Sequence, residues 1–282
     1  MPFLPAYSFR FLFPKFLLLH SSLFVITLTF IDTHTHLFAE EFDADRTEMV
    51  QRAITAGVKK MFLPNIDRSS VAGMFALEKE FPENCFPMMG LHPCSVNERY
   101  EEEIRVVEEW FDKRKFSAVG EIGMDYHWDK TFIPQQKDAF TRQIDLAKKY
   151  NLPIVIHQRE CFDDLFEIVQ SKNDKSLKGI FHCFTGTFDQ AKKIISLGGF
   201  KMGIGGAVTY KKSELPEVLK QIDIKHIVLE TDSPYLTPAP HRGKRNESSY
   251  ITFVAQKVAV VKGISVEEVA NITTKNAEEI FG

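Results

Sequence analysis

Residues 134–157, with the sequence PQQKDAFTRQIDLAKKYNLPIVIH, join an amphipathic helix to a short apolar strand that ends in a histidine. A helix is expected over Pro134–Tyr150, because its apolar residues recur at helical spacing and proline is favoured in a first helical turn. A strand is expected over Leu152–His157, where isoleucine and valine follow one another. This helix-and-strand unit is the pattern that decides the fold.

The same unit recurs along the chain. Strands are expected at residues 25–31, 58–63, 85–91, 116–122, 152–157, 179–182, 199–204 and 226–230. Helices are expected at residues 46–56, 70–81, 98–114, 134–150, 161–170, 189–197 and 214–221, with two more at 250–261 and 266–281. Eight β/α units in series, without an internal repeat or linker, predict an α/β protein with a single (β/α)8 TIM barrel and an extra C-terminal helix.

Composition limits the possible functions. The 282 residues are 44% apolar and 26% charged, as in a packed globular protein, and the length suits one barrel of about 250 residues. The net charge of −3 gives no overall positive field, so a site for nucleic acid must be built locally. The four cysteines form no C-x-x-C pair, which favours reduced thiols and a cytoplasmic location.

Residues 1–24 form an apolar extension before a domain at residues 25–282. Arg10 and Lys15 precede apolar runs, as in a signal peptide. However, no A-x-A-like site follows, and cleavage after the run would remove the first strand. His20 also interrupts the run, which leaves it short for a membrane span. We expect a disordered or packed extension, or an over-long gene start, and no membrane association.

Six polar residues stand at strand ends. A barrel brings the carboxyl ends of its strands together at one mouth, where enzymes of this fold have their active sites. Two histidines two residues apart on an extended segment leave the same face of the chain. A closed barrel cannot bury four imidazoles and two carboxylates unless they are paired or bind metal. The candidate metal ligands are His34, His36, Glu121, His157, His182 and Asp232.

These donors suit two divalent cations about 3.5–4 Å apart, with Glu121 as the bridging ligand. Such a site supports hydrolysis: the metals lower the pKa of a bound water, and Asp232 accepts its proton. Imidazoles favour Zn²⁺ or Mn²⁺, whereas carboxylate-rich phosphoryl-transfer sites commonly use Mg²⁺, so the metal is left open. The sequence has no G-x-S-x-G, G-x-G-x-x-G or Walker motif, so a serine nucleophile and a nucleotide cofactor are not expected.

A basic turn follows the eighth strand. Arg242, Lys244 and Arg245 lie within four residues and are predicted to bind phosphate oxygens of a substrate. The alternative is a solvated basic turn without a ligand.

Other side chains near strand ends are candidates for substrate contacts. His92 and His127 are predicted either to bind substrate or to be buried histidines of the core. Four aromatic residues are predicted either to stack on bases or to belong to the core. These are Tyr126, Trp128, Phe184 and Tyr235.

Five segments, in this order, carry a family resemblance: Thr33–Leu37 (THTHL), Gly120–Tyr126 (GEIGMDY), Pro153–His157 (PIVIH), His182–Gly186 (HCFTG) and Glu230–Leu236 (ETDSPYL). From about Phe30 to Phe281 the chain resembles the TatD-related metal-dependent deoxyribonucleases. The resemblance implies an amidohydrolase-like barrel that acts as a cytoplasmic 3′–5′ exonuclease on DNA ends. It also implies that His34, His36 and Asp232 hold one metal, that His157 and His182 hold the second, and that Glu121 contacts both.

We therefore expect a metal-dependent hydrolase that cleaves the phosphodiester bonds of DNA, at ends or in single strands. Two alternatives stay open. The first is hydrolysis of a small cyclic amide or ester, although enzymes of that kind often place a carboxylated lysine where Glu121 stands. The second is a non-catalytic metal-binding scaffold, which the intact ligand set disfavours. The oligomeric state is not predicted.

Overall fold

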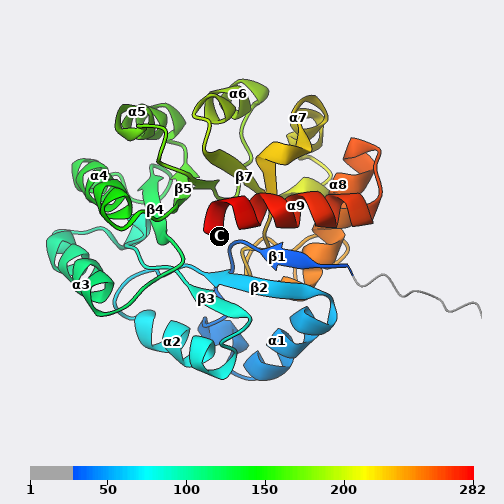
Figure 1. The fold of residues 1–282 in the computed structure, drawn as a ribbon, viewed down its shortest axis with the longest axis horizontal. Coiled ribbons are helices and arrows are strands. Elements are labelled where there is room, and N and C mark those ends of the chain that lie inside the picture. The colour runs from blue at the N-terminus through cyan, green and yellow to red at the C-terminus, as the bar shows by residue number, and fades with distance from the viewer. Residues whose placement is uncertain (1–27) are drawn as a thin grey trace, which may run out of the picture.

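The computed structural model describes residues 28–282, in which parallel strands form a central barrel surrounded by helices (Figure 1). The strands are β1 (Phe30–Asp32), β2 (Val58–Leu63), β3 (Cys85–Pro87), β4 (Val119–Asp125), β5 (Ile154–Arg159), β6 (Gly179–Phe181), β7 (Phe200–Ile204) and β8 (Ile227–Leu229). The helices are α1 (Arg46–Thr55), α2 (Val71–Glu80), α3 (Tyr100–Lys113), α4 (Ile133–Tyr150), α5 (Phe162–Lys172), α6 (Phe188–Ser196), α7 (Leu215–Gln221), α8 (Ile251–Lys262) and α9 (Val266–Phe281).

The barrel closes through two seams. Strands β1 to β3 form one parallel ladder and β4 to β8 another. At the first seam Met89 pairs with Val119, and the Gly120 N–H donates to the Met89 carbonyl at 3.0 Å. At the second, the Thr33 N–H donates to the Leu229 carbonyl at 3.1 Å. The predicted (β/α)8 barrel is therefore confirmed.

Two strands extend further toward the mouth than the sequence predicts. Strand β4 continues to Asp125 instead of residue 122, and β5 continues to Arg159 instead of residue 157. The reason is pairing: Asp125 lies opposite Arg159 in the parallel ladder, beyond the apolar part of either strand. Strand β3 is shorter than predicted and ends at Pro87, because its ladder with β2 ends at the Leu63–Pro87 pair and only an isolated bridge at Met89 follows.

Helix α9 covers the amino end of the barrel (Figure 1). The ring of Phe281 stacks on that of Phe62, with centroids 3.7 Å apart. Ile280 joins the same small apolar cluster with Ile31 and Val228. Since apolar side chains close this end, the carboxyl end of the strands is the face left for a site.

The predicted extension at residues 1–24 and the first three residues of the predicted first strand lie outside the described residues. Strand β1 begins at Phe30. Among residues 28–282, none of the helices is both long and apolar enough to span a bilayer.

Part of the basic turn has a structural partner. The Arg245 guanidinium donates to both carboxylate oxygens of Asp45, at 2.7 and 2.8 Å, and lies over the Phe42 ring. Arg52 of α1 bonds the same Asp45 at 2.9 Å and Glu247 at 2.7 Å. These ion pairs hold the pKa of Asp45 well below its usual range. The network fastens the chain after β8 to α1, so the predicted phosphate-binding role of Arg245 is not supported.

We expect Arg245→Ala to lower the free energy of unfolding by roughly 1 kcal/mol, because the pair is bidentate but about one-third exposed to solvent. Thermal unfolding should then shift down by about 2–4 °C. Lys244→Ala is the matched control, since the Lys244 side chain makes no ion pair among the described residues. Equal midpoints for the two variants would contradict a structural role for Arg245.

Candidate metal centre

The six predicted ligands converge at the carboxyl end of the barrel. His34 and His36 follow β1, and their Nε2 atoms lie 3.2 Å apart. Glu121 belongs to β4 and His157 to β5, while His182 comes directly after β6. Asp232 follows β8 in a left-handed backbone conformation with φ of 56°, which aspartate tolerates better than most residues.

Glu121 lies at the centre of this group and is 2% exposed. Its Oε2 atom is 3.1 Å from His34 Nε2 and 3.8 Å from His36 Nε2. Its Oε1 atom is 2.9 Å from His157 Nδ1 and 3.8 Å from His182 Nε2. The two oxygens therefore face two different pairs of imidazoles, which is the arrangement that a bridging carboxylate needs.

Asp232 completes the group. Its Oδ1 atom lies 3.5 Å from His36 Nε2, 3.9 Å from His34 Nε2 and 3.8 Å from His182 Nε2. At 14% exposure the Asp232 side chain is more accessible than Glu121.

The donor set fits divalent cations. Two ring nitrogens 3.2 Å apart, as in His34 and His36, can share at most one proton, but both can ligate one ion. With metal–nitrogen bonds of about 2.0–2.1 Å, tetrahedral ligand atoms lie roughly 3.3 Å apart. The ring of His182 stacks on that of His34 at 3.4 Å, an unfavourable contact if both rings are protonated. Unprotonated imidazoles that bind cations remove this conflict.

Burial and the charges of neighbouring side chains set the pKa values of these groups. Burial lowers the pKa of His34 to about 4. Burial would also lower the pKa of His157 and His182, but neighbouring carboxylates outweigh it and raise these values to about 9 and about 10. Burial would raise the pKa of Glu121, but the surrounding imidazoles hold it well below the usual range. Without metal, protons on His157 and His182 therefore balance the carboxylate charge.

Asp125 orients one predicted ligand, His157, and was missed by sequence reasoning. Its Oδ2 atom accepts a hydrogen bond from His157 Nε2 at 2.8 Å, which leaves Nδ1 directed at Glu121. Carboxylates of this kind fix the tautomer of a ligating histidine. The available signal was a carboxylate four residues after Glu121 on the same strand.

Glu230 has the corresponding place beside His182. Its Oε1 atom is 3.1 Å from His182 Nδ1, which leaves Nε2 for a cation, and it accepts the Cys183 N–H at 2.6 Å. Gly203 makes room for it, because a Cβ at position 203 would lie 2.0 Å from Glu230 Oε2. The signal here was a second carboxylate two residues before Asp232.

A pocket of about 1080 Å³ lies over these ligands. Of the three cations predicted in the basic turn, only Arg242 lines it, with its guanidinium 3.7 Å from the Tyr210 ring centroid. Lys244 is not among the lining residues. Sequence reasoning missed three other cations that line the pocket: Arg159, Lys211 and Lys212. Arg159 follows His157, and Lys211 and Lys212 follow the seventh strand. Their positions after strand ends could have indicated that they lie at the mouth of the barrel.

The structure separates the two remaining histidines. His92 lines the pocket, with Nε2 3.5 Å from Glu121 Oε1. His127 does not line it, and its Nδ1 lies 2.7 Å from Glu160 Oε1 instead. The structure gives no support for substrate binding by His127.

The four aromatic residues also divide. Trp128 and Tyr235 line the pocket and are 68% and 50% exposed. Phe184 is buried in the core, and the Tyr126 hydroxyl donates to Asp164. Only the first two rings are placed to stack on a ligand.

Because the pKa values of His157 and His182 are raised to about 9 and about 10, a cation must displace protons from them at neutral pH. We therefore expect metal affinity to fall as the pH falls below 9, with up to two protons released per protein. Calorimetric titration of stripped protein in buffers of different ionisation enthalpy measures this release. A pH-independent affinity between pH 6 and 8 would contradict the assignment.

Asp125→Asn should weaken metal binding by about 10- to 100-fold, because an amide cannot hold the proton on His157 Nε2 as a carboxylate does. Equilibrium dialysis against graded Zn²⁺ or Mn²⁺ measures the change. Asp164→Asn is the matched control, since it alters a carboxylate that bonds Tyr126 away from the ligands. Unchanged metal affinity in Asp125→Asn would contradict its orienting role.

The sequence also matches known proteins. The model of the family described as "TatD related DNase" matches residues 31–282. The "Uncharacterized metal-dependent hydrolase YabD" of Bacillus subtilis (strain 168) is 39% identical over 251 residues, which are 89% of this chain and 98% of the relative. The "3'-5' ssDNA/RNA exonuclease TatD" of Pantoea vagans (strain C9-1) is 30% identical over 256 residues, covering 89% and 98% of the two chains.

A solved structure agrees with these matches. The crystal structure of YjjV, a TatD homolog from Escherichia coli K12, superposes with a TM-score of 0.84 and 29% sequence identity. It covers 89% of this chain, which in turn covers 97% of YjjV. With its TIM barrel and metal-binding cluster, this chain is a metal-dependent hydrolase and belongs to the TatD related DNase family.

Proposed function

We propose that the protein hydrolyses phosphodiester bonds of DNA as a 3′–5′ exonuclease. The observation that carries this proposal is the group of four cations that line the same pocket as the predicted metal ligands. Arg159, Arg242, Lys211 and Lys212 line the same pocket as Glu121. In a chain with a net charge of −3, such a local concentration of positive charge favours an anionic substrate.

The cations also favour a phosphodiester over a small neutral ester or amide. Guanidinium groups bind phosphate oxygens through two parallel hydrogen bonds, and ammonium groups add positive charge. A neutral lactone offers no charge for four cations to balance. A DNA end carries several phosphates and can contact the rim and the ligand cluster together.

The ligands divide between two cations. His34, His36 and Asp232 would hold one, His157 and His182 the other, and Glu121 would contact both. When bound, divalent cations supply Lewis-acid chemistry, polarising phosphoryl oxygens and lowering the pKa of water.

Asp232 is the proposed general base. It lines the pocket, and its pKa is lowered: burial opposes this, but the charge of the nearby imidazoles prevails, so the carboxylate begins the reaction ionised. It can therefore accept a proton from the attacking water. Glu121, at 2% exposure, has no comparable access to solvent.

The exposed rings support binding of a single-stranded end. Trp128 is 68% exposed, and the Arg159 guanidinium lies 5.1 Å from its ring centroid. Stacking of a base on an aromatic side chain is worth about 1–3 kcal/mol and requires an unpaired base. The Pantoea vagans relative is named a "3'-5' ssDNA/RNA exonuclease", in agreement with a preference for single-stranded DNA.

We also propose a cytoplasmic location. The four cysteines, Cys85, Cys94, Cys161 and Cys183, form no disulfide in the structure. Free thiols are typical of proteins in a reducing compartment.

The proposal predicts metal-dependent shortening of DNA. Protein stripped of metal and reloaded with Zn²⁺, Mn²⁺ or Mg²⁺ should remove nucleotides from the 3′ end of labelled DNA, faster on single than on double strands. Glu121→Ala should lower the rate by more than about 100-fold, beyond the effect usual for residues outside the ligand set. A panel of small lactones serves as the comparison. Hydrolysis of a lactone by a protein that leaves the labelled DNA intact would overturn the proposal.

Arg242→Ala should raise KM for DNA and reduce the slope of log K against log salt by about 0.7 for each lost phosphate contact. A small activated phosphodiester should be affected much less, because it makes no contact with the rim. Arg245→Ala is the matched control and should keep the salt slope, since its guanidinium is paired with Asp45. If Arg245→Ala changed the slope as much as Arg242→Ala, the assignment of Arg242 would be wrong.

A further inference from the structure

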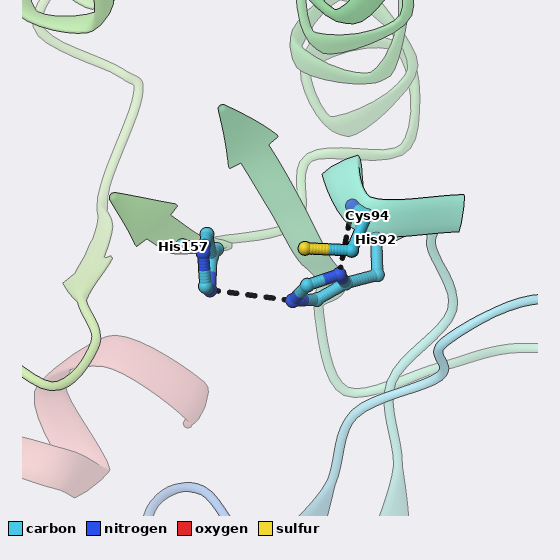
Figure 2. A group of neighbouring side chains, drawn as sticks. All are labelled: His92, Cys94 and His157. Atoms are coloured by element: carbon cyan, nitrogen blue, oxygen red, sulfur yellow. Dashed lines mark hydrogen bonds between the residues drawn. The ribbon is translucent and has the colours of Figure 1, made fainter. Parts of the chain in front are cut away.

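His92, Cys94 and His157 line the pocket, and Figure 2 shows these three side chains next to one another. One donor atom of each lies within 4.8 Å of the others, so the group has the outline of a third metal site. The hydrogen bonds around the two rings decide which nitrogen atoms carry protons. These hydrogen bonds indicate that His92 is a hydrogen-bond donor and not a metal ligand.

The tautomer of His92 is set by the backbone. The Cys94 N–H donates to His92 Nδ1 at 3.1 Å (Figure 2). A backbone N–H can only donate, so Nδ1 must present a lone pair. A neutral imidazole with a lone pair on Nδ1 carries its proton on Nε2. His92 therefore presents an N–H group, and not a lone pair, to the pocket.

The opposite tautomer is set in His157. Its Nε2 donates to Asp125 Oδ2 at 2.8 Å, so its Nδ1 is the atom available to a cation. His92 Nε2 lies 3.2 Å from this Nδ1 and 3.5 Å from Glu121 Oε1. At this corner Glu121 offers the acceptor oxygen, His157 Nδ1 is left to a cation, and His92 supplies the N–H donor.

Ligation by His92 would break this arrangement. A lone pair on Nε2 requires the proton on Nδ1, where it would meet the Cys94 N–H head-on at 3.1 Å. The N–H group of His92 instead suits an oxygen atom that sits beside the ligands of the second cation. In a phosphodiesterase that oxygen belongs to the substrate phosphate.

We propose that His92 is a substrate-binding residue that donates its Nε2–H to a phosphate oxygen next to Glu121 and His157, and that His92, Cys94 and His157 do not form a third metal site. The choice of phosphate rests on the proposed function. The assignment of donor and acceptor atoms rests only on the hydrogen bonds.

Three variants test the role of His92. His92→Leu removes the donor, His92→Gln keeps an N–H near the same place, and Cys94→Ser keeps the backbone N–H but removes the thiol. We expect all three to retain the metal content of the wild type, measured by mass spectrometry after dialysis. Loss of one metal ion in His92→Leu or Cys94→Ser would show that these side chains are ligands and would overturn the proposal.

Binding of inorganic phosphate to the metal-loaded protein, measured by calorimetry, tests the donor directly. We expect His92→Leu to weaken phosphate binding by about 10- to 100-fold, as for one hydrogen bond to a charged group, and His92→Gln to recover most of it. Equal phosphate affinity in His92→Leu and wild type would overturn the proposal. No DNA enters this measurement, so its failure is distinct from a failure of the nuclease assay.

Nitrogen NMR of the imidazole rings tests the tautomer without any variant that might fail to fold. His92 should carry its proton on Nε2 in both the stripped and the metal-loaded protein, and its Nδ1 should resonate as an unprotonated nitrogen. A proton on Nδ1, or a large shift of His92 Nε2 on metal addition, would overturn the proposal.

Discussion

The site depends on one buried carboxylate. Glu121 is 2% exposed, and an ionised carboxylate without partners would be very costly to bury. Its partners come from β5 and from the segments that follow β1 and β6, which lie far apart in the sequence. Only a closed barrel brings these strand ends to one point. The seams at Met89 and Thr33 are therefore as important to the chemistry as the ligands, because they close the ring around Glu121.

The barrel and the meeting of the six predicted ligands at its mouth were predictable because both follow from local pattern. Each apolar run is followed by the polar residue that ends it, and parallel strands collect these residues at one mouth. The ends of β4 and β5 were not predictable in this way. Their last residues, Asp125 and Arg159, are polar and extend the ladder only because they pair with each other. As a result, sequence reasoning missed one residue that orients His157 and one cation of the pocket.

The basic turn shows why a run of like charges does not define a site. Arg242 and Arg245 are three residues apart, yet one stacks on Tyr210 in the pocket and the other is bound by Asp45. Asp45 precedes Arg245 by 200 residues. No local signal distinguishes the two arginines, because the difference lies in a partner that only the folded chain provides. The residues that sequence reasoning placed in one group therefore divide between the lining of the pocket and a structural ion pair.

The histidines at the mouth are chemically alike, and groups outside the cluster make them different. Asp125 and Glu230 lie beside one nitrogen of His157 and His182 and leave the other free for a cation. The Cys94 backbone N–H has the opposite effect on His92. It donates to the lone pair of Nδ1, so the proton of His92 is on Nε2 and faces the pocket. A carboxylate neighbour thus favours a ligand, and an amide neighbour favours a donor. For His92, His157 and His182, the group beside the second ring nitrogen therefore separates a donor from a ligand, and the number of histidines at the mouth does not by itself give the number of metal ligands.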